Sequence, residues 1–295
     1  MRRLHLLTND NMEDFSQADM EMLEAIMDSN LESHVEEEQE IINTDREVVP
    51  QNSESYMVNE ETSRFSSAIW FEKIQTLSPI IAGVGGIGSY VVYLLSRLHP
   101  NKMYIYDPDS VEAVNMSGQL YCRNDVGSTK VGAIRRMIMN YSNFYCTNTF
   151  SERYTENSIA GPIMICGFDN MEARKVFFYK WLSFVNSMPR EDRKDCLFID
   201  GRLAAEELQV LSIQGDDARA IFEYESKWLF TDAEAEATVC SYKQTTFMAN
   251  MIASYMVNVF VNFAANRSDE PPIIPRDVPF LITYSAENMF TNIVM

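Results

Sequence analysis

One glycine-rich stretch constrains the fold of this chain more than any other feature of its sequence. Residues 80–89 read IIAGVGGIGS, so a short β-branched run leads through four glycines into a stretch of helical period. Such a loop turns sharply, brings the backbone close to a phosphate and aims the amino end of a helix at the anion. The stretch therefore predicts an α/β protein that binds a nucleotide through Gly83, Gly85, Gly86, Gly88 and Ser89.

The rest of the chain after Leu77 alternates short apolar runs with longer helical stretches. This alternation predicts a doubly wound, mostly parallel sheet with helices on both faces. Strands are expected at residues 80–83, 102–106, 145–150, 162–166, 197–200 and 207–214. Helices are expected at residues 88–98, 126–141 and 171–186, and residues 215–239 are expected to be irregular.

The apolar segment 242–265 predicts one more helix. Polar residues recur in it every four positions, at Thr246, Asn250, Ser254, Asn258 and Asn262. A helix with such a polar stripe packs on a protein core rather than crossing a bilayer, so no membrane partner is expected.

The first 61 residues hold most of the excess acidity of the chain. They carry 17 of the 43 acidic residues but only 3 of the 24 basic ones, which leaves a net charge of −5 for the remainder. Residues 1–62 are expected to form an acidic arm with an amphipathic helix over 16–40, and residues 63–295 the nucleotide-binding domain. The arm is either solvated or a docking element, and a charge of this sign disfavours nucleic acid as a partner.

Cysteine and histidine usage excludes several classes of site. The five cysteines are an odd number without a C-x-x-C pair, so neither a disulfide framework nor a structural zinc site is expected. The three histidines all lie before residue 100, which leaves little material for histidine-dependent hydrolysis. The first residues show no apolar run of signal-peptide length, so a cytoplasmic location is expected.

Asp107 ends the second expected strand, 24 residues after Gly83. At about this distance from a glycine loop, an acidic side chain accepts hydrogen bonds from the ribose hydroxyls of a bound nucleotide. Up to this residue, an NAD-dependent oxidoreductase explains the sequence as well as an ATP-dependent enzyme does.

The residues after Asp107 favour ATP. The pattern D-x-D-x-V-x-x-x-N-x-x-x-Q is met by Asp107, Asp109, Val111, Asn115 and Gln119, and a D-x-G-x-x-K turn follows that ends at Lys130. This order resembles the ThiF/MoeB/ubiquitin-activating enzyme (E1-like) family, and the likeness extends over about residues 63–265. The resemblance implies a Rossmann-like fold of the ThiF type that binds ATP and adenylates a carboxylate.

The resemblance also implies roles for individual side chains. It reaches Asp169, which follows the fourth expected strand, and Arg174 in the helix after it. It implies that Lys130 offsets phosphate charge and that Asp169 holds Mg²⁺, a hard cation that prefers oxygen ligands. Asn115 and Gln119 would orient the phosphates without adding charge.

The likeness to the family breaks at two arginine positions. Gly118 stands where an arginine is common, and only Arg64 remains of an upstream R-x-x-R pair whose second position is Ser67. Arg64 or Arg123 is the candidate to compensate. Because such arginines neutralise triphosphate charge, a catalytically weak nucleotide-binding scaffold of a heterodimer stays open as an alternative.

The family resemblance further implies what the chain acts on. The expected partner is a small β-grasp protein, either ubiquitin-like or a sulfur carrier, and the expected assembly is a homodimer. Cys240, just before the long helix, resembles the cysteine that accepts the activated acyl group in related enzymes. The alternative for Cys240 is a small buried side chain without a chemical role.

Overall fold

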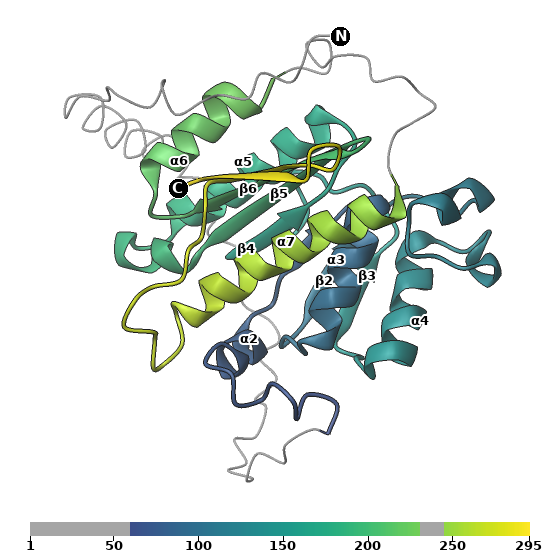
Figure 1. The fold of residues 1–295 in the computed structure, drawn as a ribbon, viewed down its shortest axis with the longest axis horizontal. Coiled ribbons are helices and arrows are strands. Elements are labelled where there is room, and N and C mark those ends of the chain that lie inside the picture. Colours follow the sequence, from purple (N-terminus) through teal and green to yellow (C-terminus); the bar gives the residue numbers. More distant parts are fainter. Residues whose placement is uncertain (1–59, 231–244) are drawn as a thin grey trace. The chain divides into compact units, whose positions relative to one another are not determined.

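A mixed eight-stranded sheet forms the centre of the fold (Figure 1). The computed structural model describes residues 60–230 and 245–295, which belong to the unit Gln51–Met295. Within these residues the strand order is β3-β2-β1-β4-β5-β6-β7-β8. The strands from β3 to β5 in this order are mutually parallel, and β6, β7 and β8 continue the sheet antiparallel. The predicted α/β fold with a mostly parallel sheet is confirmed.

The order of the parallel strands marks one place on the sheet for a ligand. These strands are β1 (Ile80–Ala82), β2 (Met103–Tyr106), β3 (Thr147–Phe150), β4 (Ile163–Cys166) and β5 (Leu197–Ala204). The chain runs from β1 outward through β2 to β3, and then returns to β4 on the other side of β1. Ligands of such sheets bind outside the carboxyl ends of the strands, where the order reverses. Here that crevice lies between β1 and β4.

Helices cover both faces of the sheet, as predicted. An aliphatic core on one face includes residues of α2 (Phe71–Thr76), α3 (Gly86–Arg97), α4 (Lys130–Ser142) and α7 (Thr246–Ala265). The other face carries α5 (Met171–Ser187) and α6 (Ala218–Glu223), and its core is aromatic. Period-two alternation separates the two cores, because on β5 Leu197 and Ile199 join the aliphatic core while Phe198 contacts the aromatic rings.

Helix α7 is long and apolar enough in composition to span a membrane, and within the described residues it is the only helix of this kind. Its buried side packs against α3, β5 and β6. In Figure 1 it crosses in front of the sheet as part of the core. This is the packed position that its polar stripe predicted.

Several expected boundaries need correction. The helix expected at 126–141 begins instead at Lys130, because Gly127 is left-handed (φ 87°) and Thr129 caps the amide of Gly132 at 3.2 Å. Residues 215–239 were expected to be irregular, but α6 and a π-helical turn, η5 (Tyr224–Trp228), occupy part of them. The side chain of Asp217 starts α6 by accepting from the amide of Ala220 at 2.9 Å.

Other elements extend the predicted set. Strand β5 continues to Ala204 and pairs with β6 (Glu207–Gln214) along its whole length. The strands β7 (Leu281–Ser285) and β8 (Phe290–Val294) follow α7 and were not expected. Short 3-10 turns also occur, namely η2 (Ala113–Ser117), η3 (Arg123–Asp125) and η4 (Arg190–Asp195). The helix expected over residues 16–40 lies outside the described residues.

Candidate functional site

The glycine loop connects β1 to α3 at the centre of the sheet. Gly83 adopts a left-handed conformation (φ 81°), which glycine tolerates without strain. A Cβ on Gly88 would lie 1.8 Å from the carbonyl oxygen of Gly83, so α3 approaches the strand end as closely as backbones allow. Gly85 precedes α3 without capping it by a side chain, which leaves first-turn N–H groups as donors toward an anion. This geometry fits a phosphate cradle.

Asp107 braces that loop from the end of β2. One carboxylate oxygen accepts the N–H of Val84 at 2.8 Å, and the other accepts the N–H of Asp109 at 2.9 Å. The side chain is buried, and desolvation raises its pKa, although the positive charge of Lys130 and the two N–H donors act in the opposite direction. The contacts of Asp107 are therefore to the protein itself, and its predicted contact with a ribose remains a prediction.

Residues 119–121 hold the loop from its other side. The N–H of Leu120 donates to Oγ of Ser89 at 3.0 Å, and the hydroxyl of Tyr121 donates to the carbonyl of Val84 at 2.6 Å. Tyr121 was not predicted as a site residue, because nothing in its sequence neighbourhood indicates that it reaches back to β1. Its buried hydroxyl, whose pKa burial raises, stays protonated and can serve as a donor.

The side chain of Gln119 lies over the loop. Its Nε2 is 3.9 Å from the position of a Cβ on Gly85. Its Oε1 is buried and has no hydrogen-bond partner among the described residues. An unpartnered buried amide oxygen is costly, and a hydroxyl or amino group of a bound nucleotide would supply the missing donor, whereas phosphate oxygens only accept. Nε2, which donates, is the atom of Gln119 that lies toward Gly85, so a contact with phosphates would use this nitrogen and stays a prediction.

Lys130 lies beside the loop as the first residue of α4. Its Nζ is 2.8 Å from Oδ2 of Asp109, and its backbone N–H donates to the carbonyl of Asp109 at 2.9 Å. The side chain of Lys130 is 9% exposed, whereas that of Asp109 is 60% exposed. The structure thus brings a largely buried cation to the predicted phosphate site, where Asp109 neutralises part of its charge.

Two predicted residues do not contact the loop in this structure. Oδ1 of Asn115 accepts the N–H of Glu112 at 2.7 Å and so caps η2. Arg64 is exposed on the segment before α2, near Glu61, which hydrogen-bonds to Asn143 at the carboxyl end of α4. That segment lies at the amino edge of the parallel strands, opposite the loop. Arg64 therefore does not reach the loop of its own chain, and Cys240 lies outside the described residues.

Asp169 follows β4 on the strand next to the loop. It is exposed, and its Oδ1 accepts from Nδ2 of Asn170 at 3.1 Å. Phe168, the residue before it, comes within 3.3 Å of a Cβ built on Gly83, so the two loops are neighbours. No group of three metal-ligating side chains occurs within residues 60–230 and 245–295. Asp169 is a single carboxylate at the carboxyl edge of the parallel strands, where the glycine loop also lies. One carboxylate suits an ion that takes its other ligands from phosphate and water.

A buried ionic cluster lies behind this loop, on the α5 side of the sheet. Asp200 is fully buried on β5 and contacts both Arg174 and Arg202. Arg174 also donates to the carbonyl of Phe168. The family resemblance included Arg174, but the sequence did not indicate that it meets Asp200, which is 26 residues away. The cluster therefore supports the loop that carries Asp169.

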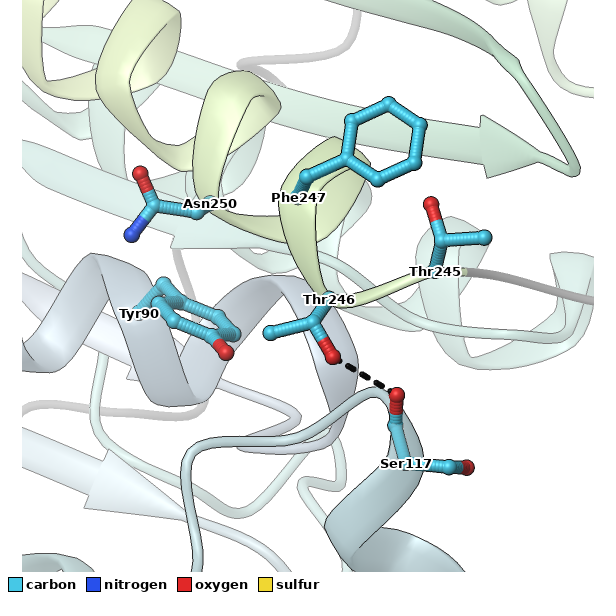
Figure 2. Close-up of a pocket in the computed structure, with 6 residues that line it drawn as sticks. All are labelled: Tyr90, Ser117, Thr245, Thr246, Phe247 and Asn250. Atoms are coloured by element: carbon cyan, nitrogen blue, oxygen red, sulfur yellow. Dashed lines mark hydrogen bonds between the residues drawn. The ribbon is translucent and has the colours of Figure 1, made fainter.

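A hollow in the described part of the chain lies next to this site rather than in it. Its volume is about 690 Å³, and it is lined by Tyr90, Ser117, Thr245, Thr246, Phe247 and Asn250. Figure 2 shows the Tyr90 ring of α3 beside Thr246 at the amino end of α7. The hydroxyl of Thr246 donates to the carbonyl of Ser117 at 2.7 Å. No charged side chain is among the described residues that line this hollow, and the glycine loop remains the candidate anion site.

A sequence model of the ThiF family matches residues 63–271. The chain belongs to the ThiF family. Members of the ThiF family are E1-like, nucleotide-binding adenylyltransferases. The resemblance that the motifs indicated is thus confirmed.

Curated relatives of this ThiF-family chain share only part of it. Ubiquitin-like modifier-activating enzyme 5 of Caenorhabditis elegans is 31% identical over 120 residues, 35% of this chain and 29% of that protein. The enzyme of the same name from Drosophila pseudoobscura pseudoobscura is 28% identical over 182 residues, 52% of this chain and 44% of that protein. The chain therefore spans less than half the length of these relatives.

Solved structures confirm the ThiF-like fold. PaaA superposes with a TM-score of 0.59 at 16% identity, over 95% of this chain and 83% of PaaA. MccB of E. coli, crystallised with ATP, superposes with a TM-score of 0.57 at 13% identity, over 83% of this chain and 73% of MccB. At such low identity these similarities establish the fold alone.

Proposed function

We propose that this ThiF-family chain adenylates the C-terminal carboxylate of a small β-grasp protein, either ubiquitin-like or a sulfur carrier. The observation that carries the proposal is the glycine loop, fixed by Asp107 and Tyr121 and adjacent to the buried cation of Lys130. MccB has been crystallised with ATP and with MccA, and the curated relatives are named as ubiquitin-like modifier-activating enzymes. These names support the choice of ATP and of a protein carboxylate.

The main role of the site residues is to stabilise the negative charge of the phosphates. A carboxylate oxygen of the partner attacks the α-phosphorus of ATP, a new P–O bond forms, and the bond to pyrophosphate breaks. Negative charge grows on the phosphates during this step, and oriented N–H groups and cations stabilise it. The amino end of α3 and Lys130 provide these groups, and Lys130 is released from Asp109 when phosphate takes its place. Mg²⁺ held by Asp169 would neutralise the leaving pyrophosphate.

Three further expectations belong to the same proposal. The thiolate of Cys240 accepts the acyl group from the adenylate in a second step, which forms a thioester and releases AMP; the protein acts as a homodimer, and its location is cytoplasmic. A homodimer would also give Arg64 a role, because this exposed arginine could then reach the loop of a second copy. The alternative is a nucleotide-binding scaffold, favoured by the missing arginines at Gly118 and Ser67.

Exchange of labelled pyrophosphate into ATP tests the proposal. Exchange that requires the β-grasp partner and is lost in Lys130→Ala is the expected result. The partner shortened by its last two residues is the matched control, because it keeps the docking surface but its new terminal carboxylate lies two residues short of the α-phosphate. ATP binding without exchange would leave the scaffold as the function, and preferential binding of NAD over ATP would refute the nucleotide assignment.

A further inference from the structure

The buried cluster around Asp200 carries more positive than negative charge. Oδ1 of Asp200 accepts from Arg174, while Oδ2 accepts from Nε of Arg202 at 2.8 Å and from the hydroxyl of Tyr224 at 2.9 Å. Burial raises the pKa of Tyr224, and it raises the pKa of Cys166 to about 11, so both stay neutral at pH 7. Burial and the neighbouring Arg202 lower the pKa of Arg174 to about 10, which leaves it charged. Two guanidinium groups thus face one carboxylate.

Among the described residues, Asp169 is the other carboxylate that acts on this cluster, and it does not balance the charge inside the protein. Asp169 acts electrostatically on Arg174, but its side chain is exposed at the loop after β4. Arg202 lies deeper, with 12% of its side chain exposed. A buried positive charge without a partner is costly, and a protein keeps one where a ligand completes it.

Two hydrogen-bond donors of this cluster are unused. Nε of Arg202 donates to Asp200, and Nη2 donates to the carbonyl of Trp228 at 2.9 Å. Nη1 is buried without a partner among the described residues. Within the same part of the structure, Nε1 of Trp228 is also buried and unpartnered. Unpaired buried donors are rare in folded proteins, and here two occur on residues in direct contact.

Three aromatic rings lie close to the guanidinium group of Arg202. Its guanidinium carbon lies 5.8 Å from the ring centroid of Tyr224 and 5.6 Å from those of Trp228 and Phe230. The π-helical turn η5 supplies both Tyr224 and Trp228, and such turns often occur at functional sites. The three rings fix the orientation of the arginine, so Nη1 and the indole N–H are held in place before a ligand arrives.

A continuous chain of contacts links this position to the glycine loop. Gly83 is adjacent to Phe168, whose carbonyl accepts from Arg174. Arg174 contacts Asp200, and Asp200 contacts Arg202. All of these groups lie at the carboxyl ends of β1, β4 and β5, the edge of the sheet that binds ligands in this fold.

We propose that Arg202 and Trp228 form a carboxylate-binding site that holds the terminal carboxylate of the acyl substrate. Nη1 of Arg202 donates to one carboxylate oxygen, and the indole N–H of Trp228 donates to the same group. The naming of the carboxylate as that of the acyl substrate rests on the proposed adenylation, whereas the site itself does not require ATP. It would give the enzyme selectivity for a free C-terminal acid over an amide.

The indole signals of the three tryptophans test this site directly. In ¹⁵N-labelled protein without ATP, N-acetyl-glycylglycine should shift the indole N–H signal of Trp228 downfield in a saturable manner. The signal of Trp181 should not move, because its Nε1 already donates to the carbonyl of Pro162 at 3.2 Å. The amide of the same dipeptide should bind about tenfold more weakly or worse, since charge-assisted hydrogen bonds are lost. Trp228→Phe assigns the signal and keeps the ring.

Variants separate this role from a merely structural one. Arg202→Lys keeps a charge beside Asp200 and should weaken binding of the acid by about tenfold or more, with an unchanged Trp181 signal as proof of folding. If that variant does not fold, Trp228→Phe provides the measurement, because it should lose the preference for acid over amide when binding is followed on the peptide's own signals.

Three results would overturn the site. The first is that the acid does not shift the Trp228 signal, and the second is that the acid and the amide bind equally well. The third is that the triple variant Asp232→Asn, Glu234→Gln and Glu236→Gln shifts the Trp228 signal in the absence of peptide. That shift would mean that carboxylates of the chain itself pair with Arg202. Failure of the proposed adenylation looks different. It would appear as absent pyrophosphate exchange while the Trp228 signal still responds to the acid.

Discussion

Replacement of Gly88 by alanine is the most direct test of how closely α3 approaches β1. The new Cβ would lie 1.8 Å from the carbonyl oxygen of Gly83 and 2.9 Å from its carbonyl carbon. Real Cβ atoms do not come within 3.0 Å of such atoms, so α3 must withdraw by about 1 Å or more. Overpacking of a core costs about 1–3 kcal/mol, and here the clash is between a helix and the backbone of Gly83, which cannot move aside as a side chain does. We expect a loss of about 3 kcal/mol in the free energy of unfolding, out of a total of about 5–15 kcal/mol.

Gly85→Ala is the matched control for this variant. A Cβ at that position meets nothing closer than Nε2 of Gln119 at 3.9 Å, so the loss of stability should stay below about 1 kcal/mol. The methyl group would instead occupy the phosphate approach and reduce ATP affinity about tenfold or more. Thermal unfolding followed by circular dichroism should give a Tm lower by about 6–12 °C for Gly88→Ala and nearly unchanged for Gly85→Ala. Equal midpoints for the two variants would refute the close approach.

Further predictions concern the side chains around the loop. Asp107→Asn should weaken ATP binding in calorimetry, and because burial raises the pKa of Asp107, the affinity of the parent protein should begin to fall on acidification at a higher pH than an ordinary aspartate would give. Tyr121→Phe removes the hydrogen bond to Val84 and should cost about 1 kcal/mol in urea unfolding; no change would mean that the bond is not formed in solution. Lys130→Ala and Asp169→Ala should each reduce pyrophosphate exchange about a hundredfold, and parent-like exchange in either protein would remove that residue from the site. Deletion of residues 1–59 should leave a folded protein that binds ATP, and an insoluble product would show that the arm is needed for folding.

The parts of the fold that sequence alone predicts are those set by local chemistry. Strand β1, the glycine loop and α3 follow from a β-branched run and the spacing of Gly83, Gly85 and Gly88. The start of α4 was misplaced because hydrophobic period continues upstream of Lys130, whereas a left-handed Gly127 ends the turn there. The spacing of apolar residues predicts which side of a helix is buried, but the capping residue determines where the helix begins.

The candidate site divides in the same way. Asp107, Lys130 and Asp169 were predictable because each follows a strand or starts a helix at a recognisable motif. Arg202 and Trp228 were not, because their pairing depends on β5 and η5 meeting across the α5 face of the sheet. Whether a buried donor lacks a hydrogen-bond partner depends on tertiary packing, and no sequence pattern predicts it.

The brace that Asp107 makes with Val84, together with the bond from Leu120 to Ser89, fixes the loop before any nucleotide arrives. Amides in loops usually exchange with solvent within a short time, but those of Val84 and Leu120 should exchange as slowly as amides in the strands. Binding to a loop already ordered in this way costs little conformational entropy. Most of the binding free energy of the phosphates would then appear as affinity, which offsets part of what the absent arginines would have contributed.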